Sequence, residues 1–371
     1  MKRISQRACG WALAAVAVSA AVAVGLSASR PAGPVAQETF RGQWLVEYKT
    51  VDGKGERTYL TLRYREEQAG KDGRTHSSNW DNTFGVEPGQ FQGLTREQAF
   101  SAGGTHVRFQ LRRDAGTFDC EGWFKAGSGA GHFTFVPSAP FAAELQRRGV
   151  GTPDARQLLQ LALADTGLAL LDELREQGYE RPNVEQLIRL GNHGVRLDYV
   201  RGLRELGYRL ETLDALVRMR DHGVSLDFIR GLRDYGFKSL TAEELVRTRD
   251  HGVSVSFIRE LEAAGYTPPA SVEALIRLRD HGVSPDFIRG LRAEGYTTLP
   301  LETLVRLRDH GVSVSFVKEL KELGYANLPA EQLVRMRDHG VNASFIRRVK
   351  SQRNDTPAVE ELIRLKNRGE Y

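Results

Sequence analysis

Cysteine is almost absent from this chain of 371 residues, which contains only Cys9 and Cys120. Cys9 lies in the extreme N-terminal segment, so Cys120 stands alone in the body of the protein. Because a disulfide framework or a cysteine-rich zinc site needs several cysteines, the sequence excludes both. Asp119 and Glu121 flank Cys120, and negative neighbours oppose thiolate formation, so we do not expect a cysteine nucleophile.

The chain also lacks the motifs of several enzyme classes. None of its nine histidines is followed by Glu, which excludes a His-Glu-x-x-His zinc helix. A Gly-x-Ser-x-Gly elbow, a phosphate loop and a dinucleotide fingerprint are absent too. Asp114, Asp119 and Glu121 are candidate paired carboxylates, but carboxylates on strands near turns more often decorate a solvated face. We therefore expect no catalytic residue, no metal site and no cofactor.

An excess of one charge is missing as well. The sequence holds 52 basic and 47 acidic residues, which gives a formal net charge of +5. Residues 271–300 contain four basic and four acidic side chains, so the charges also balance locally. A surface that follows phosphates needs an unbalanced positive stripe, and we expect no nucleic-acid partner.

The N-terminus carries a targeting signal. The basic start MKRISQR is followed by an uncharged apolar run at residues 11–28, as in a secretory signal. Small residues at 27–29 provide a cleavage site, and the run is also long enough for a tilted membrane anchor. We predict a signal peptide or membrane anchor at 1–29 and a linker at 30–39. The remainder is then exported, periplasmic or extracellular, and touches the membrane only through residues 11–28 if these are retained.

Residues 40–136 show hydrophobic alternation with a period of two. Trp44, Val46 and Tyr48 alternate with polar residues, and Gly-containing turns separate this run from later ones. This pattern predicts an antiparallel β domain, either an open sheet or a partial barrel. Trp44, Trp80, Trp123 and Phe133 are the candidates for lining a ligand pocket, although core packing is the expected role of most of them.

From residue 137 to 371 the period becomes 3.6 and the sequence repeats. The dipeptide His-Gly recurs at spacings of 29, 29, 30, 29 and 29 residues. A fixed period of this size predicts an array of about seven helical hairpins, resembling an α-solenoid, and hence an α+β protein with separate domains. Ser271 is an expected helix N-cap and Gly282 an expected helix end. Helices of about ten residues need packing against neighbouring repeats to persist.

Within each repeat the motif Arg-Asp-His-Gly suggests a structural role rather than a site. The His ends a helix, where it can interact with the terminal carbonyls. A metal ladder is excluded because equivalent positions on packed helices lie about 8–10 Å apart. The helical angle puts the Arg in the apolar stripe, so we expect an Arg–Asp ladder between repeats. Its aspartate is either the one that precedes the His or one in the first turn of the second helix, as at Asp198, Asp227 and Asp286. The structural positions are Arg220, Arg249, Arg279, Arg308, Arg337, Asp221, Asp250, Asp280, Asp309, Asp338, His193, His222, His251, His281, His310 and His339.

Residues at equivalent positions in successive repeats form a column, and three other columns recur beside this motif. The aromatic column that contains Phe287 is expected in the core. The columns that contain Arg277, on the first helix, and Arg289, on the second, point away from the apolar face. We therefore expect the arginines of both columns to be solvated.

The units RDHGVSPDFIRGLRAEGY and RDHGVSVSFVKELKELGY resemble the tandem helical repeats attached to some bacterial membrane metallopeptidases of the β-lactam-sensor, antirepressor type. The segment GTFDCEGWFKAGSGAGHFTFV is similar to the Gly-rich sheet that precedes those repeats. The resemblance covers residues 105–371 and implies an extracytoplasmic accessory or sensor-like module. The membrane peptidase part and its zinc motif are missing, so the resemblance assigns no catalytic residue.

The sequence thus predicts a non-enzymatic exported protein that mediates protein–protein interaction in the bacterial cell envelope, with a sensor or signalling association and an unidentified protein partner. The alternative is a small-ligand-binding β domain carried on a helical-repeat spacer. An apolar cavity in a closed sheet would favour the ligand binder, whereas a filled core would favour the partner binder.

Overall fold

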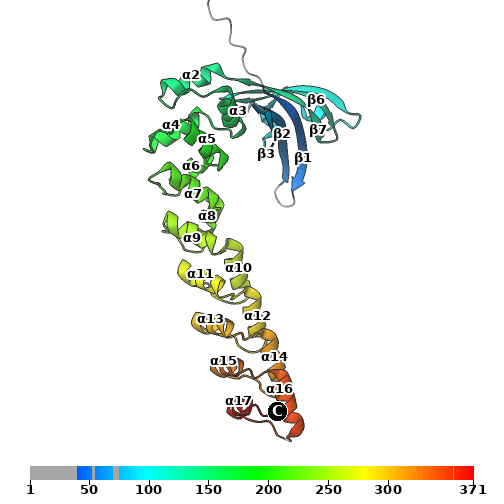
Figure 1. The fold of residues 1–371 in the computed structure, drawn as a ribbon, viewed down its shortest axis with the longest axis vertical. Coiled ribbons are helices and arrows are strands. Elements are labelled where there is room, and N and C mark those ends of the chain that lie inside the picture. The colour runs from blue at the N-terminus through cyan, green and yellow to red at the C-terminus, as the bar shows by residue number, and fades with distance from the viewer. Residues whose placement is uncertain (1–39, 52–54, 70–74, 354) are drawn as a thin grey trace, which may run out of the picture. The chain divides into compact units, whose positions relative to one another are not determined.

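A computed structural model describes residues 40–51, 55–69, 75–353 and 355–371. The predicted signal or anchor at 1–29 and the linker at 30–39 lie outside the described residues. Figure 1 shows an antiparallel sheet followed along the chain by a long run of helices. The predicted α+β fold with a helical repeat region is therefore confirmed.

The sheet has seven strands, and each is antiparallel to its neighbours. Their order is β3-β2-β1-β7-β6-β5-β4, with β3 and β4 at the two edges, so the sheet is open rather than closed. The strands are β1 (Phe40–Val51), β2 (Gly55–Ala69), β3 (Thr75–Gly85), β4 (Phe91–Gln92), β5 (Thr105–Arg113), β6 (Gly116–Lys125) and β7 (Ser128–Pro137). A 3-10 turn, η1 (Pro88–Gln90), and the short helix α1 (Arg96–Ala99) connect β3, β4 and β5.

Aromatic rings fill the inner face of the sheet. Trp44, Phe118 and Phe133 are each at most 2% exposed. The Trp44 ring packs directly against Gly122. A Cβ atom at that position would lie only 2.7 Å from the ring, so only glycine leaves enough space. Trp44 Nε1 also donates a hydrogen bond to the backbone oxygen of Glu121 at 3.2 Å. The glycines of β6 and β7 thus make room for large aromatic rings. The one polar atom of the Trp44 ring is buried with a hydrogen-bond acceptor, as a buried indole N–H requires.

Seven helical hairpins follow, with the single helix α2 before them and the single helix α17 after them. The helices are α2 (Ala139–Arg147), α3 (Ala155–Leu163), α4 (Leu168–Glu176), α5 (Val184–Asn192), α6 (Leu197–Glu205), α7 (Leu213–Asp221), α8 (Leu226–Asp234), α9 (Ala242–Asp250), α10 (Val255–Ala263), α11 (Val272–Asp280), α12 (Pro285–Ala293), α13 (Leu301–Asp309), α14 (Val314–Glu322), α15 (Ala330–Asp338), α16 (Ala343–Gln352) and α17 (Val359–Asn367).

The local signals that start and stop these helices act as predicted. The Ser271 and Ser284 side chains accept hydrogen bonds at the N-termini of α11 and α12. Gly282 has a φ of +67°, the left-handed conformation that ends α11 at low cost for glycine. Each hairpin therefore carries its own boundaries in its sequence.

The hairpins pack in two rows. First helices contact first helices along the series α3, α5, α7, α9, α11, α13, α15 and α17, and second helices contact second helices from α4 to α16. Figure 1 shows both rows, for example α11 beside α13 and α12 beside α14. In one hairpin Leu275, Leu278 and Phe287 are at most 6% exposed, so the aromatic column lies in the core as expected. Because each helix has only nine or ten residues, burial against the neighbouring hairpins maintains it.

Candidate functional site

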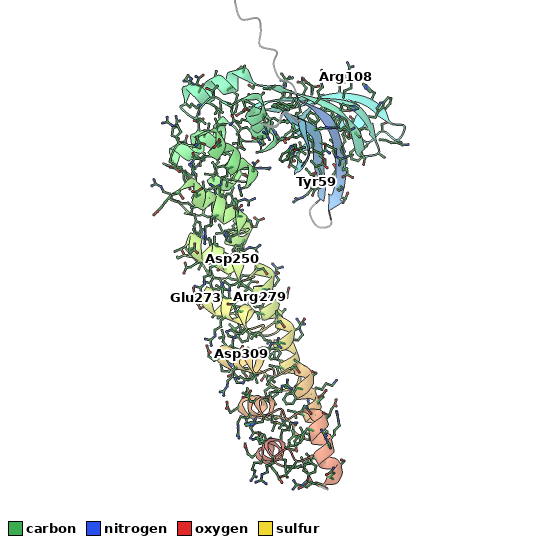
Figure 2. All side chains as sticks on the ribbon, viewed as in Figure 1. Tyr59, Arg108, Asp250, Glu273, Arg279 and Asp309 are labelled. Atoms are coloured by element: carbon green, nitrogen blue, oxygen red, sulfur yellow. The ribbon has the colours of Figure 1, made fainter. Side chains whose placement is uncertain are left out.

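The motif Arg-Asp-His-Gly lies where each first helix ends. In the third repeat of the motif, Arg279 and Asp280 are the last residues of α11, His281 is its C-cap, and Gly282 follows with positive φ. Figure 2 places Asp250, Arg279 and Asp309 on successive hairpins. Since the first helices pack side by side, each motif faces the preceding one.

The motif's arginine stacks on an aromatic ring of the preceding repeat. The Arg279 guanidinium carbon lies 4.9 Å from the centroid of the Phe257 ring, and the guanidinium also covers Gly252. The other stacked pairs have cation-to-centroid distances of 4.8–5.2 Å and are Arg220–Tyr199, Arg249–Phe228, Arg308–Phe287, Arg337–Phe316 and Lys366–Phe345. This is cation–π geometry, and it allows an arginine to lie over the apolar stripe.

The predicted Arg–Asp ladder is wrong, because the aspartates of the motif bind histidines and not arginines. The motif's aspartate binds the histidine of the preceding repeat: His251 Nδ1 donates to Asp280 Oδ1 at 2.7 Å. The same bond, at 2.5–2.7 Å, joins His193–Asp221, His222–Asp250, His281–Asp309 and His310–Asp338. His339 instead binds the neutral Asn367, at 2.9 Å. The helical angle placed the arginines correctly on the apolar face, but it contains no information about which side chain approaches from the next repeat.

The predicted role of the histidines is half correct. Each is the C-cap residue of a first helix, as expected from its position beside Gly. In five of the six, however, the ring nitrogen bonds to a carboxylate 28 or 29 residues later, and in His339 it bonds to the amide oxygen of Asn367. All four letters of the motif therefore act between repeats: Arg and Gly pack against each other, and Asp and His hydrogen bond.

In the Arg277 column, expected to be solvated, every arginine from Arg218 to Arg335 except Arg247 also connects repeats in the described part of the chain. Arg277 forms an ion pair with Glu302 on the next first helix at 2.6 Å. Equivalent pairs at 2.5–2.9 Å are Arg189–Asp214, Arg218–Glu243, Arg306–Glu331 and Arg335–Glu360. These side chains are about half exposed, so the expectation of solvation holds only for their outer parts. Exposed pairs of this kind contribute about 0–1 kcal/mol each.

The stacking of Arg279 gives a first prediction. Replacing Arg279 with alanine removes the cation over Phe257 and uncovers Gly252, and we expect a loss of about 0.5–1 kcal/mol in the free energy of unfolding. Urea denaturation, monitored by far-ultraviolet circular dichroism, measures this loss in the free energy of unfolding. Arg259→Ala is the matched control, since Arg259 is exposed and makes no ion pair among the described residues. A parent-like midpoint for Arg279→Ala would refute the stacking contribution.

The sheet and the first hairpin are joined by polar contacts as well as by the packing of α3 on β6 and β7. Asp114, in the β5–β6 turn, accepts a hydrogen bond from the backbone N–H of Leu168 at 2.8 Å, which caps α4 in place of its own N-cap, Gly167. The neighbouring Arg113 pairs with Asp165 at 3.1 Å, with its side chain only 7% exposed. One turn of the sheet thus completes a helix of the repeat array.

Replacing Asp114 with alanine should therefore affect α4 rather than the two strands that its turn connects. We expect a loss of about 1 kcal/mol, as for other N-cap removals, and faster hydrogen exchange in the first turn of α4. Asp119→Ala is the control, since Asp119 binds Gln110 on the sheet surface. Exchange at Leu168 that is equal in the two variants would contradict the capping role.

The candidate carboxylates do not form an acid–base pair. Asp114 caps α4, Asp119 accepts a hydrogen bond from Gln110, and Glu121 accepts one from Arg108. The hydrogen bond from Arg108 holds the pKa of Glu121 below its usual range, whereas a general acid needs a raised pKa. Burial, and then the charge of Asp119, raise the pKa of the Cys120 thiol, which disfavours the thiolate.

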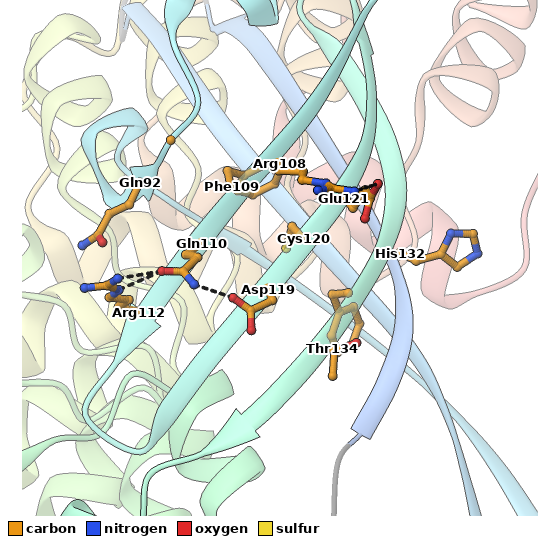
Figure 3. Close-up of a pocket in the computed structure, with 12 residues that line it drawn as sticks. Gln92, Arg108, Phe109, Gln110, Arg112, Asp119, Cys120, Glu121, His132 and Thr134 are labelled. Atoms are coloured by element: carbon orange, nitrogen blue, oxygen red, sulfur yellow. Dashed lines mark hydrogen bonds and ion pairs between the residues drawn. The ribbon is translucent and has the colours of Figure 1, made fainter.

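The four candidate aromatics differ in exposure: three lie on the inner side of the sheet, and only Trp123 lies on the outer face. Trp44 and Phe133 belong to the core, as expected. Trp80 and Trp123 do not: they are 43% and 62% exposed. A hollow of about 770 Å³ lies beside Trp123, and a second of about 640 Å³ adjoins it over β5, β6 and β7. Figure 3 shows the second hollow, where Arg108, Gln110, Asp119 and Glu121 project from neighbouring strands.

Among the described residues, no three His, Cys, Asp or Glu side chains gather closely enough to hold a metal ion. None of the helices in the described ranges is long and apolar enough to cross a membrane, and the predicted anchor at 11–28 lies outside them. In comparisons with known proteins, no protein-family model matches this chain and no curated protein matches it either.

Proposed function

We propose that this chain is a non-enzymatic, exported protein that binds another protein in the bacterial cell envelope through its helical repeats. One observation carries the proposal: the Arg, Asp and His side chains that most resemble a site are all engaged in contacts between repeats. What the array offers to other molecules is its outer surface. The basic and apolar N-terminal sequence supports export, and the resemblance to sensor-peptidase repeats supports an extracytoplasmic, sensor-associated location.

The second helices carry the candidate docking surface. Arg201, Arg230 and Arg289 each pair with a carboxylate of the chain itself. At the equivalent positions of α10, α14 and α16, three exposed basic side chains have no ion-pair partner among the described residues: Arg259, Lys318 and Arg347. Because these charges recur along one row of helices, the partner we propose is a protein with an acidic surface.

The rival function, a small-ligand binder that encloses its ligand within the sheet, receives less support. Trp44, Phe118, Phe124 and Phe135 occupy the inner face and are at most 1% exposed. The sheet is open, with different strands at its two edges. A filled interior favours the partner binder.

Site-specific crosslinking tests the proposed function. A photoreactive amino acid at position 318, on α14, should give a discrete adduct with one envelope protein in intact cells. The same amino acid at position 306, where Arg306 pairs with Glu331, is the control and should give no such adduct. Charge reversal by Arg259→Glu and Arg347→Glu should lower the yield at least fivefold, because both charges contribute to the same surface.

Two results would contradict the proposal. One is recovery of the protein crosslinked only to itself. The other is the same set of adducts from positions 318 and 306 with no effect of charge reversal, which would indicate random collisions.

A further inference from the structure

Trp123 is exposed on the outer face of the sheet, opposite to the core. Along β6, Phe118, Cys120 and Phe124 point inward, while Asp119, Glu121 and Trp123 alternate with them and point outward. The Trp123 side chain is 62% exposed. The ring of His106 meets it edge-on, with centroids 5.4 Å apart and planes 73° apart, so one neighbour supports the indole and most of the ring remains accessible.

Two parallel rows of side chains run across this face. The first row is apolar at its centre, because cross-strand pairing places Leu45 beside Ala130 and Ala130 beside Trp123. The second row is polar, and the same pairing places Gln43 beside His132 and His132 beside Glu121. The hollow of about 770 Å³ is lined by both rows.

The second hollow, of about 640 Å³, extends this surface. It shares Glu121 and His132 with the first hollow, so the two form one groove across β2, β1, β7, β6 and β5. Gln110 and Arg108 line the extension, and Figure 3 shows them with Glu121 and His132 on adjacent strands. The groove is therefore several side chains long.

The charges along the groove balance. Arg63 binds Asp81 through two hydrogen bonds of 2.8 Å, and Arg108 binds Glu121 at 2.9 Å. Arg112 and Asp119 both hydrogen bond to Gln110, on opposite sides of its amide. The two carboxylates that line the groove, Asp119 and Glu121, together with Asp81 on the neighbouring strand β3, thus offset its three arginines. A polyanion needs an unpaired positive stripe, so this groove does not suit one.

The backbone of the groove floor is also satisfied. β6 pairs along its length with β5 on one side and β7 on the other. An extended peptide binds a sheet chiefly by adding a strand at a free edge, where backbone groups are unpaired. The groove lies on the face of the sheet, so a peptide backbone would find only side chains there.

We propose that this groove binds an uncharged glycan chain. A sugar ring has an apolar C–H face and a rim of hydroxyl groups, which matches an apolar row beside a polar one. The indole of Trp123 provides the stacking platform, since its electron-rich face attracts C–H groups. Glu121 and His132 lie at hydroxyl-bonding positions beside it, and Gln110 and Arg108 continue these contacts along the chain. The site lies on the sheet and does not depend on the protein-binding surface proposed for the repeats.

Calorimetric titration of the full chain tests the proposal with three neutral hexasaccharides: β-1,4-linked glucose, β-1,4-linked N-acetylglucosamine and α-1,4-linked glucose. We expect at least one of them to bind, and Trp123→Ala to weaken that binding at least tenfold. Trp80→Ala is the matched control: Trp80 is 43% exposed but shares the inner side of the sheet with Tyr64, its cross-strand partner, and should leave the affinity unchanged.

Circular dichroism establishes that both variants are folded. The proposal is overturned if none of the three sugars binds, or if Trp80→Ala weakens binding as much as Trp123→Ala. Displacement of a bound sugar by polyphosphate or by an unstructured peptide of similar length would also overturn it, because the groove would then recognise another chemistry.

Discussion

Replacing Trp44 with alanine is expected to lower the free energy of unfolding of the sheet by about 3–5 kcal/mol. Trp44 is 1% exposed and its ring contacts two other aromatic rings, with centroids 5.1 Å from Phe109 and 5.5 Å from Phe124. The surrounding backbone cannot collapse into the space, because Gly122 and Gly131 on neighbouring strands are already in close contact. The substitution therefore leaves a cavity at the centre of the sheet.

Near-ultraviolet circular dichroism during urea denaturation measures the loss. Trp80→Ala is the control, since Trp80 is 43% exposed. We expect it to change the free energy of unfolding by less than about 1 kcal/mol. Equal midpoints for Trp44→Ala and the parent would show that the inner face is not the core of this sheet.

Replacing Glu173 with alanine is expected to destabilise the first two hairpins by about 2 kcal/mol. Its carboxylate, on α4, is 2% exposed, and it accepts hydrogen bonds from Gln177 and Arg201 and pairs with Arg204. Removing one partner of a fully buried ion pair costs about 3–5 kcal/mol, but both arginines are half exposed and regain water, which reduces the loss. Glu173→Gln keeps a hydrogen-bonding side chain and should lose less.

The same carboxylate gives a pH dependence. Burial alone would raise the pKa of Glu173, but the hydrogen bonds from Arg201 and Gln177 and the charge of Arg204 hold it below its ordinary value. A group with a lowered pKa in the folded state contributes stability that is fully present above the unfolded pKa, about 4.3 for Glu, and is lost as the pH falls through the folded value. As the pH falls from 6 to 3, the free energy of unfolding should therefore decrease less for Glu173→Gln than for the parent protein. Parallel curves would contradict this role.

The fold was predictable because its signals are local and periodic. The period-two alternation around Trp44 predicted the sheet, and the spacing of the His-Gly dipeptides predicted the hairpins. Ser284 and Gly282 mark the ends of helices through hydrogen bonds and backbone conformations that need no distant partner. Such signals remain readable without knowledge of the tertiary structure.

The contacts between repeats were less predictable, for a physical reason. A helical angle gives the direction in which Arg279 points, but not that Phe257 lies there, 22 residues earlier and on the second helix of the preceding hairpin. Adjacency in the sequence makes Asp280 the expected partner of Arg279. The offset between stacked helices instead brings Asp280 to His251.

The exposed position of Trp123 was available in the sequence. In GTFDCEGWFK, Trp123 has the same parity as Asp119 and Glu121 and the opposite parity to Phe118 and Phe124. Strand alternation thus places it on the polar face. Residue type alone does not separate Trp123 from Trp44. The groove beside Trp123 depends on five strands that only the fold brings together.

The motif Arg-Asp-His-Gly connects neighbouring repeats and is not a site within one repeat. A double-mutant cycle measures this directly, using urea denaturation of His251→Ala, Asp280→Ala and the double variant. We expect a coupling of about 0.5–1 kcal/mol, because His251 and Asp280 share a hydrogen bond across the repeat boundary. The cycle between Asp280 and His281, neighbours within one motif, should give a coupling close to zero. A larger coupling for Asp280 with His281 than for Asp280 with His251 would contradict the account.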